Sequence, residues 1–483
     1  MSKTVFMQKL RTNPSLLLGL ILAAFFLKEV FLADIFPMFT GQDEARHYNT
    51  VQYLAYPHVI MEKPTAEQNK DLLETYNFST EIKNTIVAAG LDANRDNAFD
   101  KMNFAPDSFI GQNENEINGR IWAPVNQINP PDIAGTTSLY HKLAAFIEKA
   151  LAGQSILIRF YAARIFSILL GTLALFFFYL IIKNCGFVDK TALAMTTLIS
   201  FQPRFSIYYV SVNYDALLIL AFAVFAWAGT LLLKNGASWK NLSLLAASAL
   251  LGYFDKGTGI VLIVIFIFIM AWLFWQRFSA KGKNFQYLSL AVFALAAALI
   301  LYAFGSYLPL NGGQDPLGIL GSLWQYFSKT LTLGRLSLTS RTYWGSLGWT
   351  DSALLDYAVN FIWLIEAAAL GGLLWFLFSK NPPKHLPQKK YILFALTMVV
   401  ALQLGIRLAD WKYVAGTGKI ALGAPGRYFI PNLVSHIILV FTGLGMLLRK
   451  KEYLEDALVL GAVLMFSFSA YLIFNVIIFR FYL

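Results

Sequence analysis

Charged side chains are scarce in this 483-residue sequence, and cysteine is almost absent. Lys, Arg, Asp and Glu together make up 14 % of the residues, compared with about 25 % in an ordinary soluble domain. This deficit excludes a soluble enzyme, a disordered chain and a coiled coil. Cys185 is the single cysteine, which excludes an intrachain disulfide and a thiolate metal cluster. The sequence also lacks internal repeats, low-complexity tracts and the spacing of a Walker-type phosphate loop.

Apolar residues are abundant instead. Hydrophobic residues account for 57 % of the chain and aromatic residues for 16 %. Runs of about 20 apolar residues recur from end to end, long enough for helices that cross a bilayer. The sequence therefore predicts an all-α integral membrane protein with about eleven transmembrane helices. The expected spans are 14–35, 159–182, 191–207, 213–233, 241–254, 258–275, 285–307, 353–378, 391–408, 428–448 and 455–479.

The distribution of Lys and Arg predicts a cytoplasmic N-terminus. Lys3, Lys9 and Arg11 precede the first span, and every short loop that would then face inside is basic. The first span is too long for a signal-peptide core and lacks a small-residue cleavage site, so we expect it to stay as an anchor in the plasma or inner membrane. The basic inner loops account for the formal net charge of +11. The positive net charge is therefore explained by the membrane topology, and no nucleic-acid partner is expected.

The chain divides into three regions. The second region has no spanning run and holds 15 of the 28 acidic residues, so it is predicted to be a large extracytoplasmic loop. Helical periodicity at both of its edges predicts amphipathic helices that lie in the membrane interface. The first region is the N-terminus with the first span (1–36). The second is the loop (37–155), with interfacial helices at about 43–56 and 136–152 and a polar insertion at 59–130. The third is the bundle (156–483), with outer loops at 308–352 and 409–427. The inner loops are brief, so function is expected on the outer face.

The first outer motif is Asp43-Glu44-Ala45-Arg46-His47, directly after the first span. Asp43 falls where an interfacial helix should begin, where free N–H groups and the helix dipole keep a carboxylate ionised. Such a group could act as a general base or bind a metal. His47 lies four residues on, on the same helical face, and adds a second base or ligand, while Glu44 and His47 form a Glu-x-x-His pair. The alternative is that Asp43 is only an N-cap, with Glu44 and Arg46 solvated.

The next two motifs lie at outer turns. Arg204, Asn213 and Asp215 occupy the turn between the third and fourth spans, where Arg204 could meet a phosphate and Asp215 could orient an acceptor or complete a metal site. The alternative for Asp215 is a helix cap. Lys256 lies between the fifth and sixth spans beside two glycines that would let backbone approach a ligand, and it is a candidate phosphate cation. Its alternative role is an ion pair with Asp255.

Arg427 and Tyr428 open the tenth span from outside, in Gly426-Arg427-Tyr428-Phe429-Ile430-Pro431. An arginine at the positive end of a helix suits a phosphate or diphosphate, although snorkelling alone would also place it there. Arg159 and Arg164 begin the second span and could simply anchor it. Ionisable residues inside the spans should face protein rather than lipid. These residues are Lys28, Glu29 and Glu366.

Together these motifs resemble the large bacterial members of the GT-C class, polytopic glycosyltransferases that use polyprenyl-phosphate-linked sugars, and in particular a branch with an Asp-Glu-x-x-His signature. The resemblance covers the span layout of nearly the whole chain but not the insertion at 59–130. The matching segments are 43–47, 212–215, 256–258 and 426–431.

The resemblance implies inverting transfer of a sugar from a polyprenyl-phosphate donor, such as an undecaprenyl-phosphate sugar, on the outer face. An acceptor hydroxyl on a cell-envelope polysaccharide or other glycan, a lipid or a protein would attack the anomeric carbon, with Asp43 as the base. The physical requirements are an ionised base and positive charge placed beforehand for the departing phosphate. The predicted site comprises Asp43, Glu44 and His47 as catalytic residues, Lys256, Arg427, Arg204 and Tyr428 for the donor phosphate, and Asp215, Asn213 and Arg46 to assist the acceptor or a metal.

A divalent ion is optional in this class, and Mg²⁺, Mn²⁺ or Ca²⁺ could bind at Asp43, His47 and Asp215. Two other functions compete with the glycosyltransferase. A transporter or flippase of a lipid-linked anion would use the same outer cations as a binding site. A non-catalytic assembly subunit would use the insertion at 59–130 to bind a partner.

Overall fold

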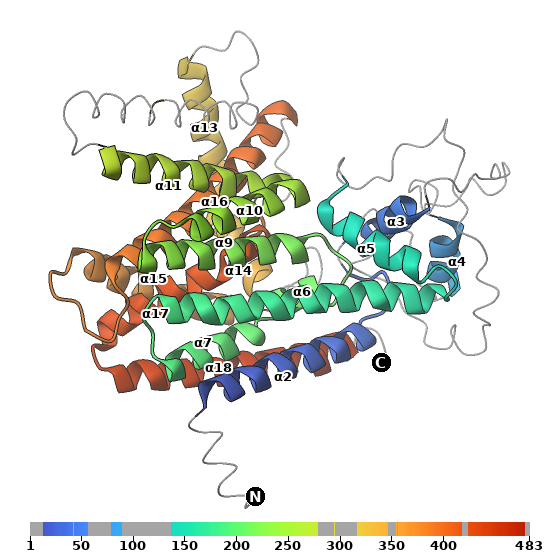
Figure 1. Ribbon diagram of the computed structural model, residues 1–483, viewed down its shortest axis with the longest axis horizontal. Coiled ribbons are helices and arrows are strands. Elements are labelled where there is room, and N and C mark those ends of the chain that lie inside the picture. The colour runs from blue at the N-terminus through green and yellow to red at the C-terminus, as the bar shows by residue number, and fades with distance from the viewer. Residues whose placement is uncertain are drawn as a thin grey trace, which may run out of the picture.

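The computed structural model describes residues 13–41, 43–56, 79–88, 137–278, 294, 316–345, 354, 356–417 and 424–478. Within these ranges all regular secondary structure is helical, and long helices pack side by side into a bundle (Figure 1). The predicted all-α class is therefore confirmed for the described part of the chain. The seventh predicted span, 285–307, lies outside the described residues except for Ala294, and the insertion at 59–130 lies outside them except for residues 79–88.

The helices follow in this order: α2 (Pro14–Ile35), α3 (Glu44–Ala55), α4 (Thr80–Ala88), α5 (Leu139–Ala150), α6 (Ile156–Asn184), α7 (Asp189–Ser200), α8 (Pro203–Tyr209), α9 (Asp215–Asn235), α10 (Trp239–Asp255), η7 (Gly257–Gly259), α11 (Ile260–Phe278), α13 (Pro316–Thr330), α14 (Leu333–Trp344), α15 (Asp356–Phe378), α16 (Lys389–Thr417), η9 (Gly426–Asn432), α17 (Leu433–Leu448), α18 (Lys451–Leu472) and η10 (Ile473–Ile477).

Eight segments of the described chain are long and apolar enough to cross a membrane, which makes this a multi-pass membrane protein. They are α2, α6, α9, η7 with α11, α15, α16, η9 with α17, and α18 with η10. Each coincides with a predicted span. The predicted span 241–254 corresponds to α10, which has 17 residues and is slightly shorter than these eight. The predicted outer loop at 409–427 begins later than expected because α16 continues to Thr417, and the loop at 308–352 contains α13 and α14.

The predicted span 191–207 is wrong as a single helix, because the chain breaks between α7 and α8. Gln202 caps α8 through its side chain, and Pro203 occupies the first turn, where its missing N–H is tolerated. The break needs polar partners inside an apolar bundle. Lys28 on α2 supplies them by donating to the Ser200 carbonyl and, at 2.8 Å, to Ser206 Oγ. Lys28 also pairs with buried Glu29 at 2.8 Å, so both residues face protein as predicted.

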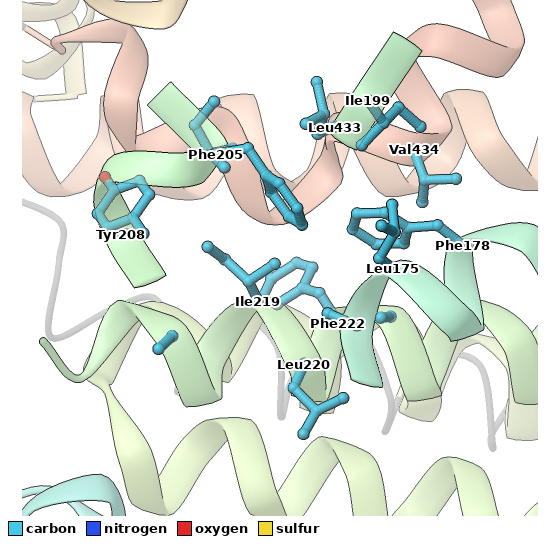
Figure 2. Close-up of a cluster of buried hydrophobic side chains, with 14 of the residues drawn as sticks. Leu175, Phe178, Ile199, Phe205, Tyr208, Ile219, Leu220, Phe222, Leu433 and Val434 are labelled. Carbon is cyan, nitrogen blue, oxygen red and sulfur yellow. The ribbon is translucent and has the colours of Figure 1, made fainter. Parts of the chain in front are cut away.

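The centre of the bundle is formed by α9 and α17. In each of these two spans 78 % of the most apolar window is buried, whereas the figure for α18 is 17 %. Figure 2 shows side chains from α6, α7, α8, α9 and α17 that meet in this core, among them Phe178, Phe205 and Phe222. The peripheral helices expose apolar side chains, as expected for helices that face lipid. At the α15–α17 crossing, a Cβ added to Gly443 would lie 1.9 Å from the Ala369 carbonyl oxygen, so only glycine permits this approach.

Helices α3, α4 and α5 lie together beside the N-terminal end of α6 (Figure 1). Arg159 at the start of α6 ties them to the bundle, because its fully buried guanidinium pairs with Glu81 of α4 and Glu148 of α5. Tyr48 of α3 donates to Glu148 Oε2 at 2.9 Å. Arg159 is therefore the centre of a buried polar network and not a simple interfacial anchor. The interfacial position of α3 and α5 stays a prediction.

Candidate active site

A fully buried ion pair connects the first predicted motif to the bundle. Arg164 of α6 binds Glu44 through two parallel contacts, Nε to Oε1 at 2.8 Å and Nη2 to Oε2 at 2.7 Å. Its remaining donors bind the carbonyls of Ala33, Phe36 and Pro37 at 2.6–2.9 Å. This arrangement fixes the end of α2, the following turn and the start of α3 against α6. Fork geometry of this kind is specific to arginine.

Glu44 does not face the outer solvent. Its carboxylate also accepts the Val212 N–H at 2.9 Å and the Gly41 N–H at 3.2 Å, and the residue has no exposed surface. Both oxygens are thus occupied by Arg164 and the backbone. The expectation that Glu44 is catalytic is not supported by this geometry, and neither is the alternative that it is solvated. The structure gives Glu44 a positioning role for the residue that precedes it.

Asp43 adopts a left-handed conformation with φ 55° and ψ 14°, and its side chain makes no cap hydrogen bond to α3. Asp43 thus occupies the N-cap position of α3, but its side chain does not cap the helix, so the expectation that helix N–H groups keep Asp43 ionised is wrong. Burial raises the pKa of its carboxyl, while Arg46, Arg427 and Lys256 oppose this shift and Asp215 adds to it. Arg46 Nη1 lies 3.9 Å from Asp43 Oδ1, and both side chains are 27 % exposed. Asp43 is thus a partly accessible carboxylate with elevated basicity.

Lys256, directly after α10, meets Asp215 at the start of α9. Lys256 Nζ lies 2.7 Å from Asp215 Oδ1, and both side chains are largely buried, at 15 % and 13 % exposed. The ammonium also lies 4.2 Å from the centre of the Tyr214 ring and 5.5 Å from that of Tyr428, within the range of cation–π attraction. Although burial alone would lower the pKa of Lys256, Asp215 raises it above its usual value. Lys256 is therefore a permanent cation.

The alternative pairing of Lys256 with Asp255 does not occur. Asp255 Oδ1 instead accepts the Tyr140 backbone N–H at 2.9 Å and so ties α10 to α5. The nearby glycine approaches protein rather than a ligand, because a Cβ added to Gly259 would lie 2.0 Å from the Gly252 carbonyl oxygen. The glycine is thus required for the tight turn that holds Lys256 in place.

Arg427 and Tyr428 reach the same cluster from η9. Arg427 Nη2 lies 3.2 Å from the Tyr428 hydroxyl, and its guanidinium stacks 4.9 Å from the Tyr428 ring centre. The Tyr208 hydroxyl donates to the Arg427 carbonyl at 2.9 Å, and the guanidinium of Arg204 lies 5.1 Å from the Tyr208 ring. Helices α8, α10 and η9 thus bring together the cations that the sequence assigned separately to the donor phosphate.

Asn213 has a local structural task. Its Oδ1 accepts the Asp215 backbone N–H at 2.8 Å, which closes the turn that starts α9. This contact sets the direction of Asp215, and the predicted role of Asn213 in acceptor binding stays a prediction.

His47 belongs to a buried chain of hydrogen bonds that sequence reasoning missed. His47 Nδ1 lies 3.0 Å from His141 Nε2, and His141 Nδ1 accepts the Ser138 backbone N–H at 3.2 Å. Since His141 Nδ1 accepts, its Nε2 carries the proton and donates to His47 Nδ1. Neutral His47 must then carry its own proton on Nε2. No spacing in the sequence links His141 to His47, because the two residues are on different helices of the loop region.

Burial keeps both histidines neutral, which predicts a pH-dependent stability. Burial lowers the pKa of His141 to about 3, and burial also lowers that of His47 well below 6.5. Because the unfolded chain binds protons that the folded protein excludes, stability should fall as the pH drops below about 6.5, by roughly 1.4 kcal/mol per pH unit for each histidine. Thermal unfolding of the purified protein between pH 7.5 and 5 would measure this slope.

The variant His141→Gln should lose a large part of the acid sensitivity, since it removes one buried histidine. His385→Gln is the matched control, because His385 lies in a loop between α15 and α16 and is not buried to the same extent. An unchanged slope in His141→Gln would contradict the neutral buried pair.

A metal site is not formed by the predicted residues. Within the described ranges, no three His, Cys, Asp or Glu side chains are grouped closely enough to hold a metal ion. Two members of the expected set have protein partners instead: His47 contacts His141, and Asp215 pairs with Lys256.

Comparison with known proteins adds a family match. Residues 151–302, just under a third of the chain, match the family described as dolichyl-phosphate-mannose-protein mannosyltransferase. This segment includes Arg204, Asp215 and Lys256 but neither Asp43 nor Arg427. No curated protein matches the sequence significantly.

A solved oligosaccharyltransferase from Archaeoglobus fulgidus, in complex with Zn and sulfate, is similar over 69 % of this chain, with 13 % identity and a TM-score of 0.29. The chain spans 44 % of the length of that protein. At this TM-score the similarity gives no residue-by-residue correspondence. The family match and the multi-span helical architecture agree with the GT-C resemblance predicted from the sequence, and the activity is proposed below.

Proposed function

We propose that this protein is a membrane glycosyltransferase of the GT-C type that moves a sugar from a polyprenyl-phosphate-linked donor to an acceptor hydroxyl on the extracytoplasmic face, with inversion at the anomeric carbon. The observation that carries the proposal is the grouping of Lys256, Arg427 and Tyr428 beside Asp43. The description of the matched family, which names a dolichyl-phosphate-linked sugar, supports a lipid-phosphate donor. The acceptor would be a cell-envelope polysaccharide or other glycan, a lipid or a protein.

The charge balance of the cluster favours a phosphate. The pKa of Asp43 responds to Arg46, Arg427, Lys256 and Asp215, and Arg204 lies close enough to interact with Arg427 and Asp215. Four cations therefore face two carboxylates, which leaves positive charge for an anionic group. Because protein contacts already orient these cations, they need little reorganisation when a phosphate leaves.

In the proposed step, the Asp43 carboxylate removes the proton from the acceptor hydroxyl. The acceptor oxygen forms a bond to the anomeric carbon while the bond between that carbon and the phosphate oxygen breaks. The electron pair of the broken bond leaves with the lipid phosphate, which Lys256 and Arg427 stabilise. Burial, which raises the pKa of Asp43, increases its strength as a base. The Glu44–Arg164 ion pair fixes the start of α3 and so positions Asp43.

The outer face follows from the predicted cytoplasmic N-terminus, since all the contributing turns then lie on the opposite side of the bundle. Incubating the purified protein with a panel of radiolabelled polyprenyl-phosphate sugars tests the donor class. The assay is run with EDTA and with Mg²⁺, Mn²⁺ or Ca²⁺, because a divalent ion is optional in the predicted chemistry. Activity with nucleotide sugars but with no lipid-phosphate sugar would overturn the proposal.

Lys256→Met should lower kcat for sugar transfer by about 100-fold, because it removes a cation that stabilises the departing phosphate. It also leaves Asp215 without its ion-pair partner, which could unfold the turn. The double variant Lys256→Met with Asp215→Asn separates the two effects, since it removes both charges. We expect it to recover thermal stability but not kcat. Lys329→Met, on α13, is the matched lysine control. Recovery of full transfer in the double variant would contradict the role of Lys256.

A further inference from the structure

A polar cavity lies among the helices, and none of the predicted site residues lines it. Its volume is about 200 Å³, and it lies between α14, α15, α16, α17 and η9. Its lining includes Tyr343, Trp344, Glu366, Phe429, Asn432 and His436. We call it the Glu366 cavity.

The Glu366 cavity is separated from the proposed transfer site by η9. In a 3₁₀-helix every third residue lies on the same face. Phe429 and Asn432 share one face of η9 and line the Glu366 cavity, whereas Arg427 and Tyr428 lie on other faces and join the Lys256 cluster. A molecule in the Glu366 cavity would therefore occupy a different place from the donor phosphate.

An apolar cavity of about 330 Å³ adjoins the Glu366 cavity, and the two share Trp344 and Glu366. It runs between α15, α17 and α18. The side chains on its outer side face the surroundings of the bundle: Phe361 is 55 % exposed and Leu464 is 51 % exposed. In a bilayer these surfaces contact lipid, so the combined cavity is polar at its inner end and open to hydrocarbon at the other. This arrangement fits an amphiphile with one polar head and an apolar chain.

The polar end presents a donor and an acceptor at a spacing that suits a hydroxyl group. His436 Nδ1 lies 2.9 Å from the Tyr343 hydroxyl, and His436 Nε2 lies 3.9 Å from Glu366 Oε1. The Glu366 carboxylate favours the His436 tautomer that carries its proton on Nε2. The distance from this Nε2 to Glu366 Oε1 is too long for a direct hydrogen bond. Glu366 Oε1 already accepts the Trp344 Nε1–H at 3.2 Å, and a carboxylate oxygen can accept a second donor. A ligand hydroxyl between His436 and Glu366 could therefore accept from His436 and donate to Glu366. An ammonium could not do both, because it has no acceptor.

Charge and depth also favour an uncharged head. Neither cavity is lined by Lys or Arg among the described residues, and the acidic side chain in the lining is Glu366, so a phosphate would find no cationic side chain of those types there. Glu366 lies twelve residues before the end of α15 at Phe378, and His436 lies twelve before the end of α17 at Leu448. At 1.5 Å per residue this is about 18 Å from those ends, or roughly 12 Å below the opposite edge of a 30 Å hydrocarbon core. A charged head at that depth is unfavourable.

We propose that the Glu366 cavity and its apolar extension bind a membrane amphiphile with an uncharged, hydroxyl-bearing head, and that Glu366 and His436 hold its hydroxyl group. The site concerns binding and is independent of transfer at the Lys256 cluster. Two kinds of lipid share this chemistry, a lipid alcohol such as diacylglycerol and a neutral monoglycosyl lipid.

Photo-crosslinking of the full-length protein in nanodiscs tests the site. The probe is diacylglycerol with a diazirine in one acyl chain, and mass spectrometry maps the labelled peptides. We expect labelling on α15, α17 and α18. Unlabelled monoglucosyl diacylglycerol and unlabelled diacylglycerol are the two competing arms, and the stronger competitor identifies the head. Labelling that a long-chain alkylammonium or phosphatidylglycerol suppresses more strongly than either neutral lipid would overturn the proposal.

Variants distinguish specific binding from lipid contact. Glu366→Leu should weaken probe binding by about tenfold, because it removes a hydrogen bond to a charged acceptor. Ala358→Phe, which fills the apolar extension without removing a polar group, should reduce labelling as well. Asp356→Asn on the same helix is the matched control, since its side chain is 90 % exposed and should leave labelling unchanged. Equal labelling of all three variants would show that the probe reports bulk lipid only.

Discussion

Asp43→Asn is expected to lower kcat for sugar transfer by about 10²- to 10⁴-fold, the usual contribution of a general base. Asparagine has nearly the same shape as aspartate but cannot take up the acceptor proton. The variant should fold normally, because Asp43 makes no cap hydrogen bond and its ion contact with Arg46 is 3.9 Å long and partly exposed. Single-turnover transfer with the active lipid-phosphate sugar would measure the loss.

Asp34→Asn is the matched control, because Asp34 is exposed near the end of α2 and should tolerate the same change with full activity. The pH profile gives a second readout. Since the base must be ionised, transfer falls as the pH drops through its pKa, and burial places that pKa above 3.8. The acid limb should be absent from the residual activity of Asp43→Asn. Wild-type turnover in this variant would rule out Asp43 as the base.

Arg164→Met is expected to lower the free energy of unfolding by about 3–5 kcal/mol, the usual effect of leaving one member of a buried ion pair without its partner. Glu44 has no exposed surface, and Arg164 holds both of its oxygens as well as the carbonyls after α2. Loss of the arginine therefore releases the turn that carries Asp43. Thermal unfolding in detergent, together with transfer activity, measures both consequences.

Two further variants make this experiment specific. Arg164→Met with Glu44→Gln removes both charges and should recover part of the stability, because no buried charge remains without a partner. Arg341→Met is the matched arginine control. Its partner Asp356 is 90 % exposed, so its loss should cost less than about 1 kcal/mol. If Arg164→Met and Arg341→Met had equal effects, the contact with Glu44 would not be a structural centre.

Span positions could be predicted well from the sequence because the signal is local. An apolar run and its ends specify a helix such as α2, whose bounds coincide with the predicted 14–35. The prediction was wrong at 191–207 because average hydropathy does not register a cap. Gln202 and Pro203 start a new helix, α8, within the apolar run. Lys28 of α2 stabilises the break by donating a hydrogen bond to the Ser200 carbonyl.

The residues of the candidate site could be predicted from the sequence, but their ion-pair and hydrogen-bond partners could not. Asp43, Lys256 and Arg427 were identified from their positions at outer turns, and the structure brings Lys256 and Arg427 to one cluster beside Asp43. Sequence reasoning assigned Glu44 to catalysis and offered Asp255 as the partner of Lys256. The structure instead pairs Glu44 with Arg164 and Lys256 with Asp215.

The sequence by itself determined the membrane class, most of the spans and the residue types available at the turns between them, because hydrophobicity and helical period are properties of short segments. Only the tertiary structure decided which charges meet. Arg164 and Glu44 are 120 residues apart, and His141 and His47 are 94 residues apart. Ion-pair and hydrogen-bond partners are chosen by distances of about 3 Å after folding, and no local pattern encodes those distances.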